Sequence, residues 1–320
     1  MVTIKDVAKK AGVAISTASY ALNNDPRVSE KTRKKVLKVA KELNYYPNAA
    51  ARNLKRQRTN TIGVFVDGFA GPVYANILDG IHIELSENKF NIIVTTGDSG
   101  KRMLLERQVD GGIVIDHHLS DELLLMVAEK GLPLILLDRH LSGENIYVST
   151  IDNEKIVYEF IVEMIKRGYR NFAYLSGSKT SYDNLHRYKG YCLALEEYKL
   201  DYGPVYYGEF TKRGGYRIGK KLIESNEPLP EFIYSANDEM AIGLMDAFQE
   251  AGIRIPDDVA IAGFDNIELA SYYTPKLTTI DVKRFEWGKA LARAMIDLLK
   301  NDNTSIDVPV HCKVMYRDSC

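Results

Sequence analysis

The chain has 320 residues, of which 45% are hydrophobic and 27% are charged, so it can bury the cores of two or three domains. No apolar run approaches the roughly 18 residues that a membrane span needs, and the first residues form no apolar signal segment. The net charge of −1 excludes a uniformly basic or acidic protein, but it conceals an uneven distribution.

Residues 1–60 contain 14 Lys and Arg against four acidic residues, a net charge of +10, and the rest of the chain carries −11. A basic segment ahead of an acidic body indicates that this segment meets a polyanion. A solvated lysine-rich helix would give the same charge, so charge alone leaves both interpretations open. Three scattered cysteines, without C-x-x-C spacing, favour neither a disulfide framework nor a metal site, and point to a cytoplasmic location.

The basic segment predicts three short helices. The first begins at a capping-box-like Thr3-x-x-Asp6 pattern and ends at Gly12. The second spans about Ile15 to Leu22, and the third runs from a cap at Ser29 to about Asn44. Only three residues separate the first two helices, which favours a helix-turn-helix, although a plain three-helix bundle has the same spacing.

Residues 48–60 form a linker with helix-favouring alanines and four basic side chains. The linker has no apolar stripe, so by itself it would be marginal as a helix. We expect it to order on contact with DNA.

From Thr61 onward, short apolar runs alternate with helical patterns such as Asp152–Arg167 and Glu239–Ala251. This alternation predicts parallel sheets covered on both faces, with enough strands for two doubly wound sheets and a cleft between them. Ligands bind at the carboxyl ends of such strands. The predicted strands are Ile62–Val66, Ile92–Thr95, Gly112–Ile115, Leu134–Leu137, Phe172–Leu175, Phe232–Tyr234 and Val259–Ala262.

Motifs along nearly the whole chain resemble the LacI/GalR family of bacterial transcription regulators. The head contributes Thr3–Val13, Ser16–Asn23 and Leu43–Leu54, and the core contributes Asn237–Ala241 and Gly263–Asn266. The resemblance implies a helix-turn-helix headpiece in residues 1–47, a hinge in residues 48–60 and a core like periplasmic sugar-binding proteins in residues 61–320. It also implies a homodimer on a palindromic DNA operator, with no cofactor, no enzymatic activity and no membrane partner.

The family pattern implies roles for individual head residues. Ile15, Ser16 and Tyr20 occupy base-reading positions, and Thr17, Ser19 and Asn23 lie near phosphates. In the hinge, Asn48, Ala51 and Leu54 are expected to contact DNA, with Leu54 as a minor-groove wedge.

The chain departs from the family pattern in three places. Ala14 replaces the usual serine, so the second helix lacks its side-chain cap, and Tyr20 replaces an arginine. We therefore expect a different operator half-site. The chain is about ten residues short between Gly97 and Val109, which predicts a truncated helix there.

The resemblance also implies an effector pocket that suits a sugar, because aromatic rings pack on sugar faces and polar groups pair its hydroxyls. A nucleobase or another small metabolite is the alternative effector. The candidate pocket residues are Phe69, Tyr74, Asp138, Ser181, Arg187, Phe210, Asn237 and Asp265.

Other functions have weaker support in the sequence. Asp116-His117-His118 after a predicted strand is similar to metal-dependent phosphoesterases, but no D-x-D pattern accompanies it. We therefore expect His117 and His118 to form an exposed loop, with no metal site. The intact head argues against a binding protein without regulatory output. The sequence does not distinguish a repressor from an activator, or an inducer from a corepressor.

Overall fold

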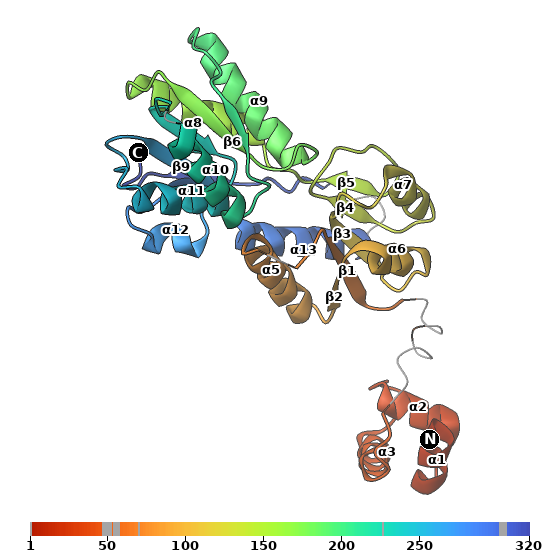
Figure 1. Cartoon of the computed structure of the whole chain (residues 1–320). Coiled ribbons are helices and arrows are strands. Elements are labelled where there is room, and N and C mark those ends of the chain that lie inside the picture. The colour runs from red at the N-terminus through yellow and green to blue at the C-terminus, as the bar shows by residue number, and fades with distance from the viewer. Residues whose placement is uncertain (1, 47–52, 54–57, 70, 226, 301–305) are drawn as a thin grey trace. The chain divides into compact units, whose positions relative to one another are not determined.

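The structure is a computed structural model that describes residues 2–46, 53, 58–69, 71–225, 227–300 and 306–320. The chain forms two compact units, Met1–Thr59 and Asn60–Cys320 (Figure 1). Each unit has a hydrophobic core of its own. Among the described residues, no helix combines the length and apolar character that crossing a bilayer requires.

The head consists of helices α1 (Ile4–Ala11), α2 (Ile15–Leu22) and α3 (Glu30–Glu42). The bounds predicted for α1 and α2 are confirmed, and α3 ends two residues earlier than predicted. Gly12 ends α1 in the left-handed region at φ 62°, where glycine has no Cβ penalty. The Asp6 carboxylate accepts from the Thr3 N–H at 2.9 Å, which is the reach-back contact that the capping-box pattern predicts.

The first half of the larger unit is a five-stranded parallel sheet in the order β2-β1-β3-β4-β5. The elements are β1 (Thr61–Val66), α5 (Val73–Glu87), β2 (Asn91–Thr95), α6 (Gly97–Leu105), β3 (Gly111–Ile115), α7 (Asp121–Glu129), β4 (Leu134–Leu136) and β5 (Ile146–Val148), together with α13 (Arg284–Lys300), which comes later in the chain and packs on α5. Alternate residues of a strand face opposite sides of the sheet. In β1, Ile62 and Val64 pack in the cluster that includes α5 and α13, whereas Phe65 packs in the cluster that includes α6 and α7.

The second half is a six-stranded sheet in the order β11-β10-β9-β8-β6-β7, in which only β11 is antiparallel. Without β11, both sheets have the same strand order, so the prediction of two doubly wound sheets is confirmed. The elements are α8 (Asn153–Lys166), β6 (Phe172–Ser176), α9 (Tyr182–Glu197), β7 (Val205–Tyr207), α10 (Lys212–Ser225), β8 (Phe232–Ser235), α11 (Asp238–Glu250), β9 (Ala260–Asp265), α12 (Glu268–Tyr272), β10 (Thr278–Val282) and β11 (Cys312–Met315).

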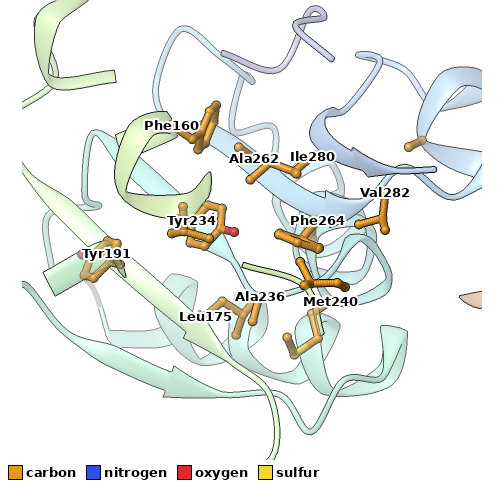
Figure 2. Packing of buried hydrophobic residues seen from close by; sticks show 14 of the residues in the cluster. Phe160, Leu175, Tyr191, Tyr234, Ala236, Met240, Ala262, Phe264, Ile280 and Val282 are labelled. Carbon is orange, nitrogen blue, oxygen red and sulfur yellow. The ribbon is translucent and has the colours of Figure 1, made fainter. Parts of the chain in front are cut away.

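Buried aromatic side chains fill the core of the second half. The Phe160 ring of α8 lies 5.9 Å from the Tyr234 ring of β8, and Figure 2 shows them in the same core as Phe264 of β9. All three rings are fully or almost fully buried. Such rings contribute large apolar areas and prefer the tilted arrangement seen here, which fixes α8 against the sheet.

The chain crosses between the two halves three times. It passes from β5 to α8, from β10 to α13, and from α13 to β11. Ser149, in the β5–α8 crossing, bonds to residues near the other two crossings. Its hydroxyl accepts from Trp287 Nε1, at the start of α13, at 2.8 Å and donates to the carbonyl of Val308, between α13 and β11, at 2.8 Å. These buried contacts couple the segments that any movement between the halves must bend.

Four strands were not predicted from the sequence: β5, β7, β10 and β11. Strands β5 and β7 have only three residues each, too few for a periodicity signal. Strand β10 is fully buried although it contains Thr278, Thr279 and Asp281, so it has no apolar run. By contrast, α6 has only nine residues, as the short segment between Gly97 and Val109 predicts.

Candidate DNA interface and effector cavity

Helix α2 of the head has one buried side and one open side. Ala18 and Ala21 pack in the head core, while Ile15 is 48% exposed and Ser16 and Asn23 are also exposed. Thr17, Ser19 and Tyr20 are partly exposed. The six candidate DNA-contacting residues of α2 and its C-cap are therefore all accessible, on a short helix that packs against both α1 and α3.

Tyr20 is held by a neighbour that the sequence analysis did not single out. The Arg27 guanidinium lies 3.9 Å from the centre of the Tyr20 ring. Arg27 in turn makes two charge-assisted hydrogen bonds to the Asp25 carboxylate, at 2.9 and 2.7 Å, which lower the pKa of Asp25 to about 2. Arg27 therefore covers one face of the Tyr20 ring, on a side chain that is partly exposed.

The hinge candidates Asn48, Ala51 and Leu54 lie outside the described residues. Their assignment as DNA contacts stays a prediction from the sequence.

The larger unit contains a cavity of about 410 Å³ at the carboxyl ends of the strands of both sheets. This position is the one at which doubly wound sheets bind ligands, and the volume suits a small molecule. The lining residues include Asp67, Tyr74, Ile115, His117, Asp138, Ser178, Ser181, Tyr182, Asp183, Arg187, Glu209, Phe210, Thr211, Asn237, Glu239, Asp265 and Arg284.

Seven of the eight effector candidates line this cavity. The exception is Phe69, whose side chain is 67% exposed and is not among the described lining residues. Phe69 lies in the loop between β1 and α5 and faces solvent, whereas Tyr74, in the first turn of α5, lines the cavity. The structure therefore does not bring Phe69 to the candidate site.

Arg187 and Asp265 are both buried and both engaged by other protein groups. Arg187 donates from Nε to Asn153 Oδ1 at 2.9 Å and from Nη1 to the Ala236 carbonyl at 2.6 Å. Asp265 accepts from Arg284 at 2.7 Å and has a positive φ of 113°, a strained backbone for a residue with a side chain. Strain of this kind gathers at binding sites, where the surrounding structure holds a side chain in a fixed direction.

Two other candidate effector-binding residues also cap helices. Ser181 accepts from the Asn184 N–H at the start of α9, and Asn237 accepts from the Met240 N–H at the start of α11. Asn237 also donates to the Phe210 carbonyl at 3.1 Å, which fixes the loop that carries the Phe210 ring. That ring fits over Gly177, where a Cβ would lie 2.2 Å from Phe210 Cζ.

The cavity is acidic, which the sequence analysis did not foresee. Six carboxylates line it, against the two guanidinium groups of Arg187 and Arg284. Asp138 is paired with Arg139 at 2.8 Å, and Asp265 with Arg284. Burial, reinforced by the charge of Asp265, raises the pKa of Glu239 above its usual range.

Tyr74 remains a hydrogen-bond donor under all ordinary conditions. Its burial and the charges of Asp67 and Asp183 raise the pKa of its hydroxyl to about 12. Four acidic lining residues were missed because they come from two loops and from the first turns of α9 and α11, which only the fold brings together. They are Asp67, Asp183, Glu209 and Glu239.

His117 and His118 form an exposed turn after β3, as predicted. Asp116 itself is fully buried and accepts from the His118 N–H at 3.0 Å and from the Gly97 N–H at 3.2 Å. His117 lines the cavity, next to Asp67.

A larger hollow of about 700 Å³ lies near His140, Asp152 and Tyr182. It is more open than the cavity and is lined mainly by α8, α9 and the β5–α8 crossing, not by strand ends. We therefore regard the smaller, more enclosed cavity as the candidate effector site.

Known protein families match both the head and the core of the chain. Residues 3–48 match the family described as bacterial regulatory proteins, lacI family, and residues 161–320 match the periplasmic binding protein-like domain. Catabolite control protein A of Priestia megaterium is 31% identical over 99% of both chains. The chain belongs to the LacI family.

Other LacI-family relatives include the transcriptional repressor PurR of Vibrio atlanticus, 33% identical over 100% of this chain and 98% of the relative. The ribose operon repressor of Haemophilus influenzae is 32% identical over 95% of this chain and 93% of the relative. Among solved structures, a Lac repressor dimer bound to operator and an anti-inducer has a TM-score of 0.86 at 25% identity, covering 99% of this chain and 98% of that one. A CelR–cellobiose complex has a TM-score of 0.73 at 28% identity, covering 100% of both chains.

The LacI-family assignment settles the class of protein. The chain is a transcriptional regulator with a DNA-binding helix-turn-helix head and an effector-binding core, and it is not an enzyme.

Proposed function

We propose that this chain is a repressor that binds a palindromic operator as a homodimer, with a sugar in the core cavity controlling operator affinity. The basic head with an accessible α2 supports DNA binding, and relatives named repressors support repression over activation. The Lac repressor dimer on its operator supports the dimer and the DNA partner. Action on a chromosomal operator would place the protein in the cytoplasm.

The charge of the cavity narrows the effector class. Six lining carboxylates would repel a phosphate or carboxylate group, so sugar phosphates and uronic acids are disfavoured. Phe210 and Tyr74 supply aromatic surface for a sugar ring, and Asp265 and Asp138 can accept from its hydroxyls. We propose a neutral or amino-substituted sugar, a choice that the cellobiose-bound relative also supports.

The position of the cavity allows a bound effector to control the arrangement of the two halves of the core. Its lining comes from both halves of the core, and the two halves are joined by three crossings. An effector that contacts both halves binds one relative arrangement better than the other and so shifts the population between them.

A thermal-shift screen of the full chain tests the effector class. The panel contains neutral sugars, amino sugars, sugar phosphates, uronic acids and nucleobases, and hits are then titrated into operator binding after the operator has been found by binding-site selection. We expect hits among the neutral or amino sugars. Stabilisation only by anionic sugars, or only by a nucleobase, would contradict the proposed class while leaving the regulator assignment intact.

The assembly is tested by sedimentation. Twice the 36.1 kDa mass of one chain is expected in solution and on operator DNA. A monomer that binds a palindromic site with one head would contradict the homodimer.

A further inference from the structure

The structure brings two histidines and an aspartate together at the edge of the effector cavity. Asp67 follows β1 and His117 and His118 follow β3, and these strands are paired neighbours with Val66 opposite Ile115. His117 Nδ1 lies 3.1 Å from Asp67 Oδ1, and His118 Nδ1 lies 2.7 Å from the same oxygen. One ligand atom from each of the three residues falls within 4.8 Å of the others.

These distances are close to those between neighbouring ligands of one metal ion. Two ligand atoms that are each about 2.1 Å from a tetrahedral zinc ion lie about 3.4 Å apart, and about 3.0 Å apart in octahedral geometry. Imidazole nitrogen and carboxylate oxygen are ligand types that zinc and related divalent ions accept. We propose that Asp67, His117 and His118 bind a divalent transition-metal ion at the edge of the cavity.

The surroundings hold the histidine turn in place. Buried Asp116 accepts from the His118 backbone N–H at 3.0 Å, and its Oδ1 also lies 3.2 Å from His118 Nδ1. Its other oxygen accepts from Gly97. Because Asp116 is buried and accepts from two backbone N–H groups, it fixes the backbone of the turn that carries both histidines, which is its positioning role here.

The three ligands are accessible, so an ion can enter and its remaining coordination positions are open. Their side chains are 36% exposed for Asp67, 49% for His117 and 62% for His118. Three protein ligands with open positions characterise sites that take a further small ligand. Asp67 and His117 also line the cavity, so metal binding and effector binding are expected to influence each other.

The experiment is calorimetric titration of Zn²⁺ into the full chain, prepared without a histidine tag and freed of metal by a chelator. We expect one saturable site per chain, with affinity at least about 10-fold weaker in Asp67→Asn and in His118→Ala. His82→Ala is the matched control, because His82 is an exposed histidine on α5 outside the cluster and should leave binding unchanged.

Cobalt provides a second readout that separates this site from the cysteines. Co²⁺ bound by imidazole and carboxylate gives visible d–d absorption without the near-ultraviolet charge-transfer band of a thiolate ligand. We expect this spectrum in the parent and its loss in His118→Ala. No saturable site in the parent, unchanged binding in both ligand variants, equal loss in His82→Ala, or a thiolate band would overturn the proposal.

Discussion

Tyr20 combines a departure from the family pattern with an unusual local environment. The Arg27 guanidinium covers its ring, and Arg27 is itself fixed by Asp25. These contacts hold the Tyr20 side chain, and with it the hydroxyl, in one orientation. A hydrogen-bonding group that is held in place discriminates better between bases than one on a freely rotating side chain.

We predict that Tyr20→Phe, which keeps the ring under Arg27, weakens binding to the preferred operator by about 0.5–1.5 kcal/mol, or about 2- to 12-fold. Tyr20→Arg should change the half-site recovered by binding-site selection, because a guanidinium can bind guanine in a bidentate manner. Recovery of the parent's half-site with the arginine variant would place Tyr20 outside base recognition.

Arg187 shows how one residue can serve both the pocket and the fold. It lines the cavity, but two of its nitrogens already donate to Asn153 and to the Ala236 carbonyl, and its charge is 3.6 Å from the Phe264 ring. Burial lowers the pKa of Arg187, but the charges of Asp265 and Asp183 outweigh it and raise the pKa overall, so the guanidinium stays charged.

We predict that Arg187→Leu destabilises the core, because the buried Asn153 and Ala236 oxygens lose their donor at about 1–3 kcal/mol each. Lys189→Ala is the matched control on the same helix, since its ion pair with Glu154 is exposed and contributes little. The measurement is the thermal unfolding midpoint of both variants. An unchanged midpoint for Arg187→Leu would mean that Arg187 serves the effector alone.

At the scale of elements, helix α5 packs closely against α13. Because α13 directly follows β10 of the second sheet, this packing joins the two halves of the core. The two backbones approach at paired glycines. A Cβ at Gly80 would lie 2.2 Å from the Phe285 carbonyl oxygen, and one at Gly288 would lie 2.2 Å from the Ile77 carbonyl oxygen.

We predict that Gly80→Ala destabilises the core by about 1–3 kcal/mol, because the methyl group forces the two helices apart. Alanine normally favours a helix over glycine by about 1 kcal/mol, so a loss of stability reports the contact and not the propensity. Gly68→Ala is the control, since no atom lies within 4 Å of the added Cβ. Stabilisation by Gly80→Ala in a denaturant titration would show that α5 and α13 are less closely packed.

At the scale of the whole molecule, the uneven distribution of charge gives the head and the core different roles in DNA binding. The head and linker carry +10 and the rest carries −11, so the phosphate backbone of DNA attracts the first and repels the second. The acidic core should therefore contribute little direct affinity for DNA, and should act by controlling the arrangement of the two heads.

This charge division predicts the salt dependence of operator binding by the full chain. With about five phosphate contacts per head and two heads, log K should fall with log salt with a slope of about −9. Fluorescence anisotropy on labelled operator measures the slope, and Lys189→Ala in the core should leave it unchanged. A slope near zero would be incompatible with a head that binds DNA through its charge.

The sequence by itself determined the number and order of most elements and the class of protein. Periodicity and capping residues are local properties, so α2 and the predicted strands of both sheets could be located without tertiary information. The head was also predictable, because its caps, turns and charge all lie within sixty residues. Likeness to a family then supplied seven cavity residues that no local rule identifies.

Only the tertiary structure decided the chemistry of the cavity. Its carboxylates come from loops after β1, β4 and β7, the start of α9, the start of α11 and the end of β9, which are separated by up to 198 positions between Asp67 and Asp265. It also decided that Phe69 faces solvent and that Asp67 meets His117 and His118. Charge and coordination depend on distances in space, and parallel pairing of strands is what brings the ends of distant segments to one edge.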